Sequence, residues 1–288
     1  MVITGEEAKL RIKKDGIDGI VNTIINADCL DIMRLMKDKS VDLVVTSPPY
    51  DNLRDYEGYE FNFESIAKEL YRIMATGGVV VWVVGDMSDD LGETLTAFKQ
   101  AIYFREIGFR VHDTMIYAKN GTGFPNPKRY HQCFEYMFIF SKDIPKTVNL
   151  IKDRKNSLAG QTHNKRWERQ KNGVIKLREK DSYSIGEYGA RWNIWEYEIG
   201  YMKTTIDEIA FEHPAMFPEK LVADHIQSWS NEGDLVLDPM NGSGTTTKMA
   251  KLLGRRFIGI EISEKYCKIA QDRLRQEILF YAGNKKGR

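Results

Sequence analysis

The sequence has few cysteines, no long apolar run and almost no net charge. Its three cysteines, Cys29, Cys133 and Cys267, lie far apart and form no Cys-x-x-Cys pair, which argues against a structural zinc site and a disulfide framework. The longest apolar run, Val79–Val84, is far shorter than the roughly 18 residues that span a bilayer. Residues 1–14 are charged and lack the apolar segment of a signal peptide. We therefore expect a cytoplasmic protein with reduced thiols, no metal centre and no membrane segment.

The chain does have enough apolar material for a core, and it has one basic block. Hydrophobic residues make up 42% and charged residues 29%, a composition that excludes wholesale disorder. The formal net charge of +1 hides ten basic and three acidic residues within Ile151–Lys180, a local charge of +7. Trp167 and other aromatic residues lie in the same region. This block is either a nucleic-acid contact or a solvated charged loop.

Short apolar segments rich in β-branched residues alternate with helical patterns along most of the chain. These segments are typical of strands buried on both faces of a parallel sheet. They are Val41–Val45, Val79–Val84, Val111–Tyr117, Tyr136–Phe140, Leu235–Leu237 and Phe257–Ile262. Helical spacing is present in Phe63–Met74, Leu91–Ile107 and Thr246–Leu253. The alternation predicts an α/β fold with a doubly wound, mostly parallel sheet.

The alternation stops between residues 151 and 205, where basic residues, Gly, Asn and aromatics replace the periodic apolar runs. We interpret this region as an insertion between two halves of one α/β domain. The expected organisation is residues 1–150 as one half, 151–205 as the insertion and 206–288 as the other half.

A first candidate functional loop, Thr46-Ser47-Pro48-Pro49-Tyr50, follows the predicted strand Val41–Val45. Ligands of open α/β sheets bind at the carboxyl ends of strands, and two consecutive prolines fix the backbone there. The Ser47 hydroxyl and the Pro48 carbonyl offer hydrogen-bond acceptors, and the Tyr50 ring offers a stacking surface. By itself the segment is equally consistent with a strand that ends in a proline turn.

A second candidate loop, Asp238-Pro239-Met240-Asn241-Gly242-Ser243-Gly244-Thr245-Thr246, links a predicted strand to a helix. Its glycines permit a tight turn and a close approach of the backbone to a ligand. It has neither the Walker A pattern nor the complete dinucleotide fingerprint. Glu261 follows one strand later, where an acidic side chain hydrogen-bonds the ribose of nucleotide-like cofactors. Together the turn and the acid suggest an adenosyl group.

These segments, with Gly259-Ile260-Glu261-Ile262-Ser263 and the following Tyr266, resemble the amino-methylating DNA methyltransferases. Asn26-Ala27-Asp28-Cys29 and His213–Leu221 are further pieces of the same likeness. The Thr46–Tyr50 segment, which matches the catalytic motif of that family, precedes the Asp238–Thr246 segment, which matches its cofactor motif. This is the motif order of the family's β group. The resemblance implies a Rossmann-like fold dependent on S-adenosylmethionine, with 151–205 as the target-recognition region. It also implies a prokaryotic or phage enzyme that associates with the nucleoid.

The resemblance also implies roles for individual residues. Ser47, Pro48, Pro49 and Tyr50 would be catalytic. The cofactor would contact Asp28, Cys29, Phe217, Asp238, Pro239, Met240, Gly242, Gly244, Thr245, Thr246 and Glu261. Asp28 has a second interpretation as the cap of the following helix. Met240 departs from the family, which usually has an aromatic residue there, and Phe217 is expected to cover that side instead.

The expected macromolecular partner is double-stranded DNA, from which the target base is flipped out. The candidate DNA contacts are Lys165, Arg166 and Arg169 in the basic block, and Lys128 and Arg129 in a Gly- and Pro-containing segment that is otherwise a plain surface loop. The resemblance leaves room for a cognate restriction endonuclease acting on the same site, and for a monomer or a homodimer.

The first residue of the catalytic tetrapeptide separates the two target bases. In this family Ser at that position mostly marks cytosine N4 methylation, whereas Asp or Asn mostly marks adenine N6, so Ser47 favours cytosine N4. Adenine N6 remains the alternative. Methylation of RNA or of protein glutamine is disfavoured by the basic insertion and the motif order, and a non-catalytic DNA-binding module would need neither loop. Methylation at cytosine C5 is excluded because no cysteine follows a proline.

Overall fold

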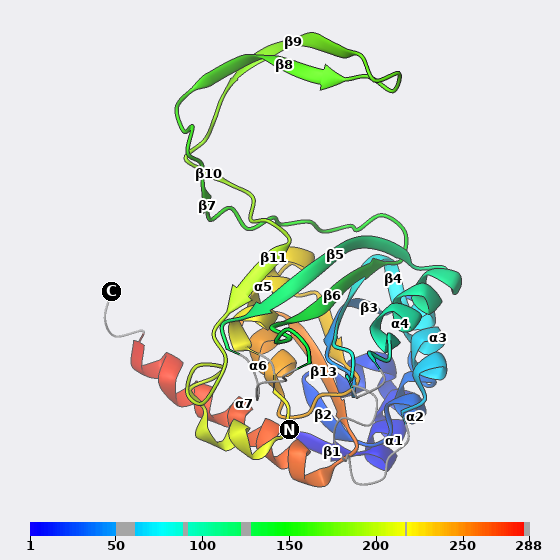
Figure 1. The fold of residues 1–288 in the computed structure, drawn as a ribbon. Coiled ribbons are helices and arrows are strands. Elements are labelled where there is room, and N and C mark those ends of the chain that lie inside the picture. The colour runs from blue at the N-terminus through cyan, green and yellow to red at the C-terminus, as the bar shows by residue number, and fades with distance from the viewer. Residues whose placement is uncertain (50–60, 89–91, 122–127, 217, 285–288) are drawn as a thin grey trace. The chain divides into compact units, whose positions relative to one another are not determined.

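The computed structural model describes residues 1–49, 61–88, 92–121, 128–216 and 218–284, and their side chains except those of 163–166, 178–183 and 276–284. The chain divides into two compact units, Met1–Asn149 with Asn193–Arg288, and Leu150–Trp192. The larger unit contains the central sheet and its helices (Figure 1).

The central sheet has nine strands in the order β1-β2-β13-β12-β3-β4-β6-β5-β11. All neighbours pair in parallel except β6, which is antiparallel to both β4 and β5. The strands are β1 (Val2–Thr4), β2 (Thr23–Asn26), β3 (Val41–Thr46), β4 (Met74–Val84), β5 (Arg110–Lys119), β6 (Phe134–Ser141), β11 (Ile194–Tyr197), β12 (Leu235–Asp238) and β13 (Arg256–Glu261). The predicted doubly wound, mostly parallel sheet is thus confirmed.

Helices flank this sheet. They are α1 (Gly5–Asp15), α2 (Cys29–Met33), α3 (Phe63–Ile73), α4 (Thr96–Glu106), α5 (Glu219–Trp229), α6 (Thr245–Leu252) and α7 (Glu264–Asn284), with 3-10 turns η1 (Gly16–Ile20) and η2 (Glu208–Glu212). In α3 the side chain of Asn62 caps the helix by accepting from the Ser65 N–H at 3.2 Å. Ile66, Leu70 and Ile73 then face the core at helical spacing. The three helices expected from the sequence correspond to α3, α4 and α6.

The core on the β4 side is aromatic. Trp82 is fully buried and donates its indole N–H to Gln100 Oε1 at 2.8 Å, so its polar atom is satisfied. Phe104 stacks on Phe140 with ring centroids 4.5 Å apart. This packing holds α4 against β4 and β6.

The smaller unit consists of two antiparallel strand pairs. β7 (Arg154–Lys155) pairs with β10 (Tyr188–Gly189), and β8 (Thr162–Arg169) pairs with β9 (Ile175–Ser184). Gly173, with φ +83°, allows the tight connection between β8 and β9, where its N–H donates to the Gln170 carbonyl at 2.9 Å. The region predicted as the insertion therefore overlaps this unit, while β11 belongs to the central sheet.

Candidate active site

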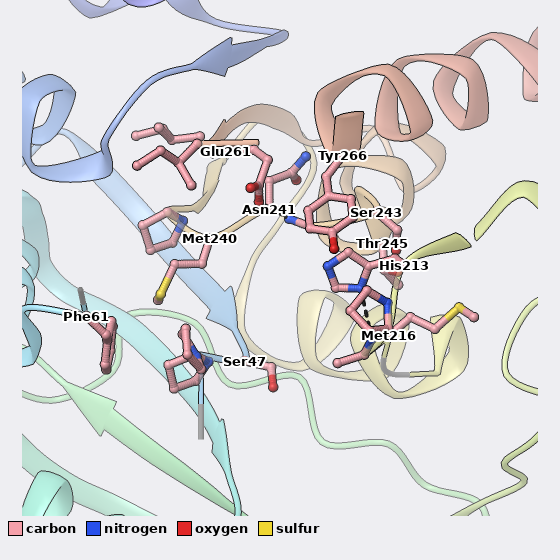
Figure 2. Close-up of a pocket in the computed structure, with 18 of the residues that line it drawn as sticks. Ser47, Phe61, His213, Met216, Met240, Asn241, Ser243, Thr245, Glu261 and Tyr266 are labelled. Carbon is pink, nitrogen blue, oxygen red and sulfur yellow. Dashed lines mark hydrogen bonds between the residues drawn. The ribbon is translucent and has the colours of Figure 1, made fainter. Parts of the chain in front are cut away.

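A cavity of about 750 Å³ opens at the carboxyl ends of β2, β3, β12 and β13 (Figure 2). Asp28 follows β2, Ser47 follows β3, Pro239 follows β12, and Glu261 ends β13. Because these strands are parallel, residues far apart in the sequence meet at one edge of the sheet. The volume of the cavity lies within the range of small-molecule binding sites.

Glu261 holds the glycine turn in place. Its Oε2 accepts a hydrogen bond from the Gly242 N–H at 2.7 Å, and its Oε1 accepts one from the Ser263 N–H at 2.9 Å. Burial raises the pKa of Glu261, and these hydrogen bonds partly oppose the rise. Gly242 has φ +48°, and a Cβ there would lie 2.9 Å from His213 Nε2, so the turn requires glycine. Pro239, Met240, Gly242 and Thr245 line the cavity with Glu261.

Asp238 joins the two candidate loops from behind the cavity. Its Oδ1 accepts from the Thr46 hydroxyl at 2.7 Å and from the Met240 N–H at 3.1 Å. Burial raises the pKa of Asp238 to about 6 despite these bonds. The Thr246 hydroxyl donates to the Val45 carbonyl at 3.0 Å, a second link to β3. Asp238 and Thr246 are buried beside the cavity and do not line it, so their geometry suits positioning the loops.

Gly244 also lies outside the cavity lining. It precedes α6 with φ +80°, and a Cβ there would lie 2.6 Å from the Cβ of Ala270 in α7. Its lack of a side chain therefore serves the contact between α6 and α7.

Asp28 and Cys29 line the cavity at the start of α2. Asp28 Oδ1 accepts from the Leu30 N–H at 2.7 Å, so the residue is the helix cap. Burial raises the pKa of the Cys29 thiol to about 12, which keeps it protonated and unreactive at neutral pH.

Ser47, Pro48 and Pro49 line the cavity opposite the glycine turn, whereas Tyr50 and Phe217 lie outside the described residues. The predicted DNA contacts are not among the lining residues. Lys128 and Arg129 belong to the segment between β5 and β6. Lys165, Arg166 and Arg169 belong to β8 in the smaller unit, where the structure pairs Arg169 with Ile175.

The cavity also contains polar residues to which the sequence analysis assigned no individual role. Asn241 is buried, and its Nδ2 has no hydrogen-bond partner among the described residues, although its Oδ1 accepts from the Thr247 hydroxyl at 3.1 Å. The rings of His213 and Tyr266 have centroids 4.4 Å apart. Lys119 and Glu135 form an ion pair of 2.5 Å on the β5–β6 wall. Asn241, His213 and Tyr266 had a signal in the sequence, because each lies in one of the segments that carry the family resemblance, whereas Lys119 and Glu135 had none.

Four buried or half-buried charged side chains form a network beside the glycine turn. The fully buried Arg273 donates to the Ser243 carbonyl at 2.7 Å and to the Thr245 hydroxyl at 3.1 Å. It also pairs with Asp207 at 3.0 Å and Glu219 at 2.6 Å, and Lys248 pairs with the same two acids at 2.8 and 2.6 Å. The network connects α5, α6 and α7 to the turn.

Within the described part of the chain, no three His, Cys, Asp or Glu side chains gather as a metal site. The helices described there are too short or too polar to cross a membrane.

Comparison with known proteins agrees with this geometry. The family model of DNA methylases that covers N6 and N4 enzymes matches residues 41–272. The chain is 56% identical over 245 residues to the orphan methyltransferase M.BamHII of Bacillus amyloliquefaciens, which covers 85% of this chain and 92% of that protein.

Two solved structures share the fold. The cytosine-N4-specific PvuII DNA methyltransferase has a TM-score of 0.62 at 20% identity, over 87% of this chain and 85% of that one. The M1.HpyAVI–SAM complex has a TM-score of 0.58 at 22% identity, over 87% and 98%. With a family model matched over most of its length and a close relative across nearly all of that relative, this chain belongs to the N6/N4 DNA methylase family.

Proposed function

We propose that this DNA methyltransferase transfers a methyl group from S-adenosylmethionine to N4 of a cytosine flipped out of double-stranded DNA. The observation that carries the proposal is the single cavity lined by both the Ser47-Pro48-Pro49 loop and the Gly242 turn with Glu261. A methyl-transfer site must bring a cofactor and an acceptor base together, and this cavity has one candidate loop for each.

The residues at the glycine turn fit the cofactor. Gly242 lines the cavity with its backbone, and the Glu261 carboxylate beside it can accept hydrogen bonds from hydroxyl groups such as those of a ribose. The unpartnered Nδ2 of the buried Asn241 is a further donor beside the turn. Asp28, Cys29, Pro239, Met240 and Thr245 would complete the contact. When bound, S-adenosylmethionine supplies an electrophilic methyl group.

The Ser47 loop would prepare the acceptor amine. The lone pair of an exocyclic amine is delocalised into the ring, so the amine is a poor nucleophile. The Ser47 hydroxyl and the Pro48 carbonyl would accept its two N–H hydrogens and localise the lone pair toward the methyl group. Pro49 would keep the loop rigid, and Tyr50 would stack on the base. Much of the acceleration then comes from orientation of the two reactants.

The choice of cytosine depends on Ser47, since Ser at the first position of this tetrapeptide mostly accompanies cytosine N4 methylation. The alternative is adenine N6 in the same cavity, because both bases present an exocyclic amine beside a ring nitrogen.

The smaller unit would bind DNA outside the cavity. Lys165, Arg166 and Arg169 lie on its β8–β9 hairpin, and a two-stranded β-ribbon fits the major groove. Lys128 and Arg129 would contact the backbone near the cavity. A cognate restriction endonuclease, a monomeric or homodimeric state and nucleoid association stay predictions.

The test is to express the protein in cells without DNA methyltransferases, digest the DNA and resolve its nucleosides by mass spectrometry. We expect N4-methylcytosine, and sequencing of the modified DNA gives the recognition site. N6-methyladenine would change the base and keep the methyltransferase proposal, whereas neither product would refute both. A Ser47→Ala variant of unchanged cofactor affinity serves as the inactive control.

A further inference from the structure

Three polar side chains form one cluster on the β5–β6 wall of the cavity. In the antiparallel register Tyr117 lies opposite Glu135, and Lys119 is two residues further along β5, so all three share one face of the sheet. All three line the cavity. Lys119 Nζ lies 2.5 Å from Glu135 Oε1 and 5.6 Å from the Tyr117 ring centroid.

The cluster is mostly shielded from water. The side chains of Lys119 and Glu135 are 25% and 15% exposed, and burial together with the charge of Glu135 raises the pKa of Tyr117. A shielded ion pair is expensive to desolvate, and apolar residues of similar size stabilise a fold at least as well. The pair therefore suits a role in the cavity better than a role in holding β5 to β6.

The chemistry of the pair defines the ligand group it fits. An ammonium has three N–H donors, and Glu135 accepts one of them. Lys119 thus brings a charged donor, oriented by Glu135, to the cavity that also contains Ser47. Such a donor fits a ring nitrogen with a free lone pair and repels a ring N–H.

We propose that Lys119, held by Glu135, donates a hydrogen bond to the ring nitrogen beside the exocyclic amine of the flipped base. The inference rests on the proposed function. That atom is N3 in cytosine and N1 in adenine, and both are acceptors. In guanine and thymine the corresponding N1 and N3 carry hydrogen, so the ammonium would face another donor. Lys119 is accordingly a specificity-determining residue that admits cytosine or adenine and rejects guanine and thymine.

A thermodynamic cycle between protein and base tests this pairing. The duplexes contain the recognition site with either the natural target base or its analogue without the ring nitrogen, 3-deazacytosine or 1-deazaadenine. The proteins are the wild type, Lys119→Met, and Lys119→Met combined with Glu135→Leu, which leaves no unpaired charge. The matched control is Lys146→Met, because Lys146 forms an ion pair of the same 2.5 Å length with Asp42 and does not line the cavity.

In single-turnover methylation, the wild type and Lys146→Met should lose about 10- to 100-fold on the deaza duplex, the effect of a lost hydrogen bond to a charged group. Both Lys119 variants should be slow on the natural duplex and lose little more on the analogue. Their affinity for S-adenosylmethionine should equal that of the wild type.

One result overturns the inference alone, namely a full deaza penalty in folded Lys119 variants. If that penalty comes with a salt slope about one unit shallower than that of the wild type, Lys119 contacts a phosphate instead. A wild-type protein that methylates neither base overturns both this inference and the proposed function.

Discussion

Replacing Asp238 by Asn should abolish a defined part of the pH dependence of stability. Asp238 is buried, and its Oδ1 accepts from the Thr46 hydroxyl and the Met240 N–H. An Asn side chain keeps an oxygen at that position and carries no charge. The substitution therefore removes the cost of a buried carboxylate and preserves both hydrogen bonds that join the two loops.

The magnitude follows from the pKa of Asp238, which burial raises from 3.8 to about 6. Between these two values the folded protein retains a proton that the unfolded chain has released. The free energy of unfolding must then fall as pH rises. Each pKa unit corresponds to about 1.4 kcal/mol, so the shift of Asp238 costs about 3 kcal/mol in full, and about 2 kcal/mol of this develops between pH 4 and pH 7.

Urea unfolding of the wild type and Asp238→Asn at pH 4, 5, 6 and 7 measures this contribution as a difference between two curves. We expect the variant to gain about 2 kcal/mol relative to the wild type across this range. Asp18→Asn, at a side chain that is 78% exposed, is the control and should follow the wild type. Parallel curves for the wild type and Asp238→Asn would refute the reasoning, because the buried carboxylate would then carry no cost.

Most of the sheet could be predicted from the sequence because its strands are buried on both faces. β3, β12 and β13, for example, are short, mostly apolar runs that turn residues flank, which is the pattern of a buried strand. Edge strands escaped prediction, since β1 has three residues and β11 alternates exposed and buried positions over only four. The reversed direction of β6 was also inaccessible, because strand direction depends on tertiary connections.

The two loops of the candidate site were predictable because each follows a strand directly. Parallel strands bring their carboxyl ends together, so Ser47 and Glu261 meet in one cavity despite their separation in the sequence. The sequence pattern could not separate the residues that line the cavity from those that hold its loops in place. Asp238 and Gly244 belong to the same motif as Gly242, yet only Gly242 lines the cavity.

Lys119 and Glu135 gave no signal because their proximity depends on the β5–β6 register. The contacts of Arg273 were hidden for a related reason. It lies on α7 and meets Asp207 and Glu219 only after three separate segments pack together. Ion pairs between distant segments have no local sequence pattern, in contrast to helix caps and strand ends.

Four further variants test the site and the smaller unit. Glu261→Gln keeps only one oxygen for the two N–H groups of Gly242 and Ser263. Calorimetry should show that it binds S-adenosylmethionine more weakly by about 1–3 kcal/mol. Unchanged affinity would remove Glu261 from the cofactor site. Neutralising Lys165 and Arg166 together should make the slope of log DNA affinity against log salt concentration shallower by about two units, without changing cofactor affinity. If the DNA affinity of the wild type does not depend on salt, the basic block is only a solvated surface. Arg273→Met removes one of the two cations, Arg273 and Lys248, that pair with Asp207 and Glu219, so thermal unfolding should show a loss of about 3–5 kcal/mol. Arg273→Lys keeps the charge and should retain part of this stability. Since Arg273 also donates to the turn at Ser243 and Thr245, folded Arg273→Lys should bind the cofactor more weakly, and equal affinity would show that the network supports the fold alone.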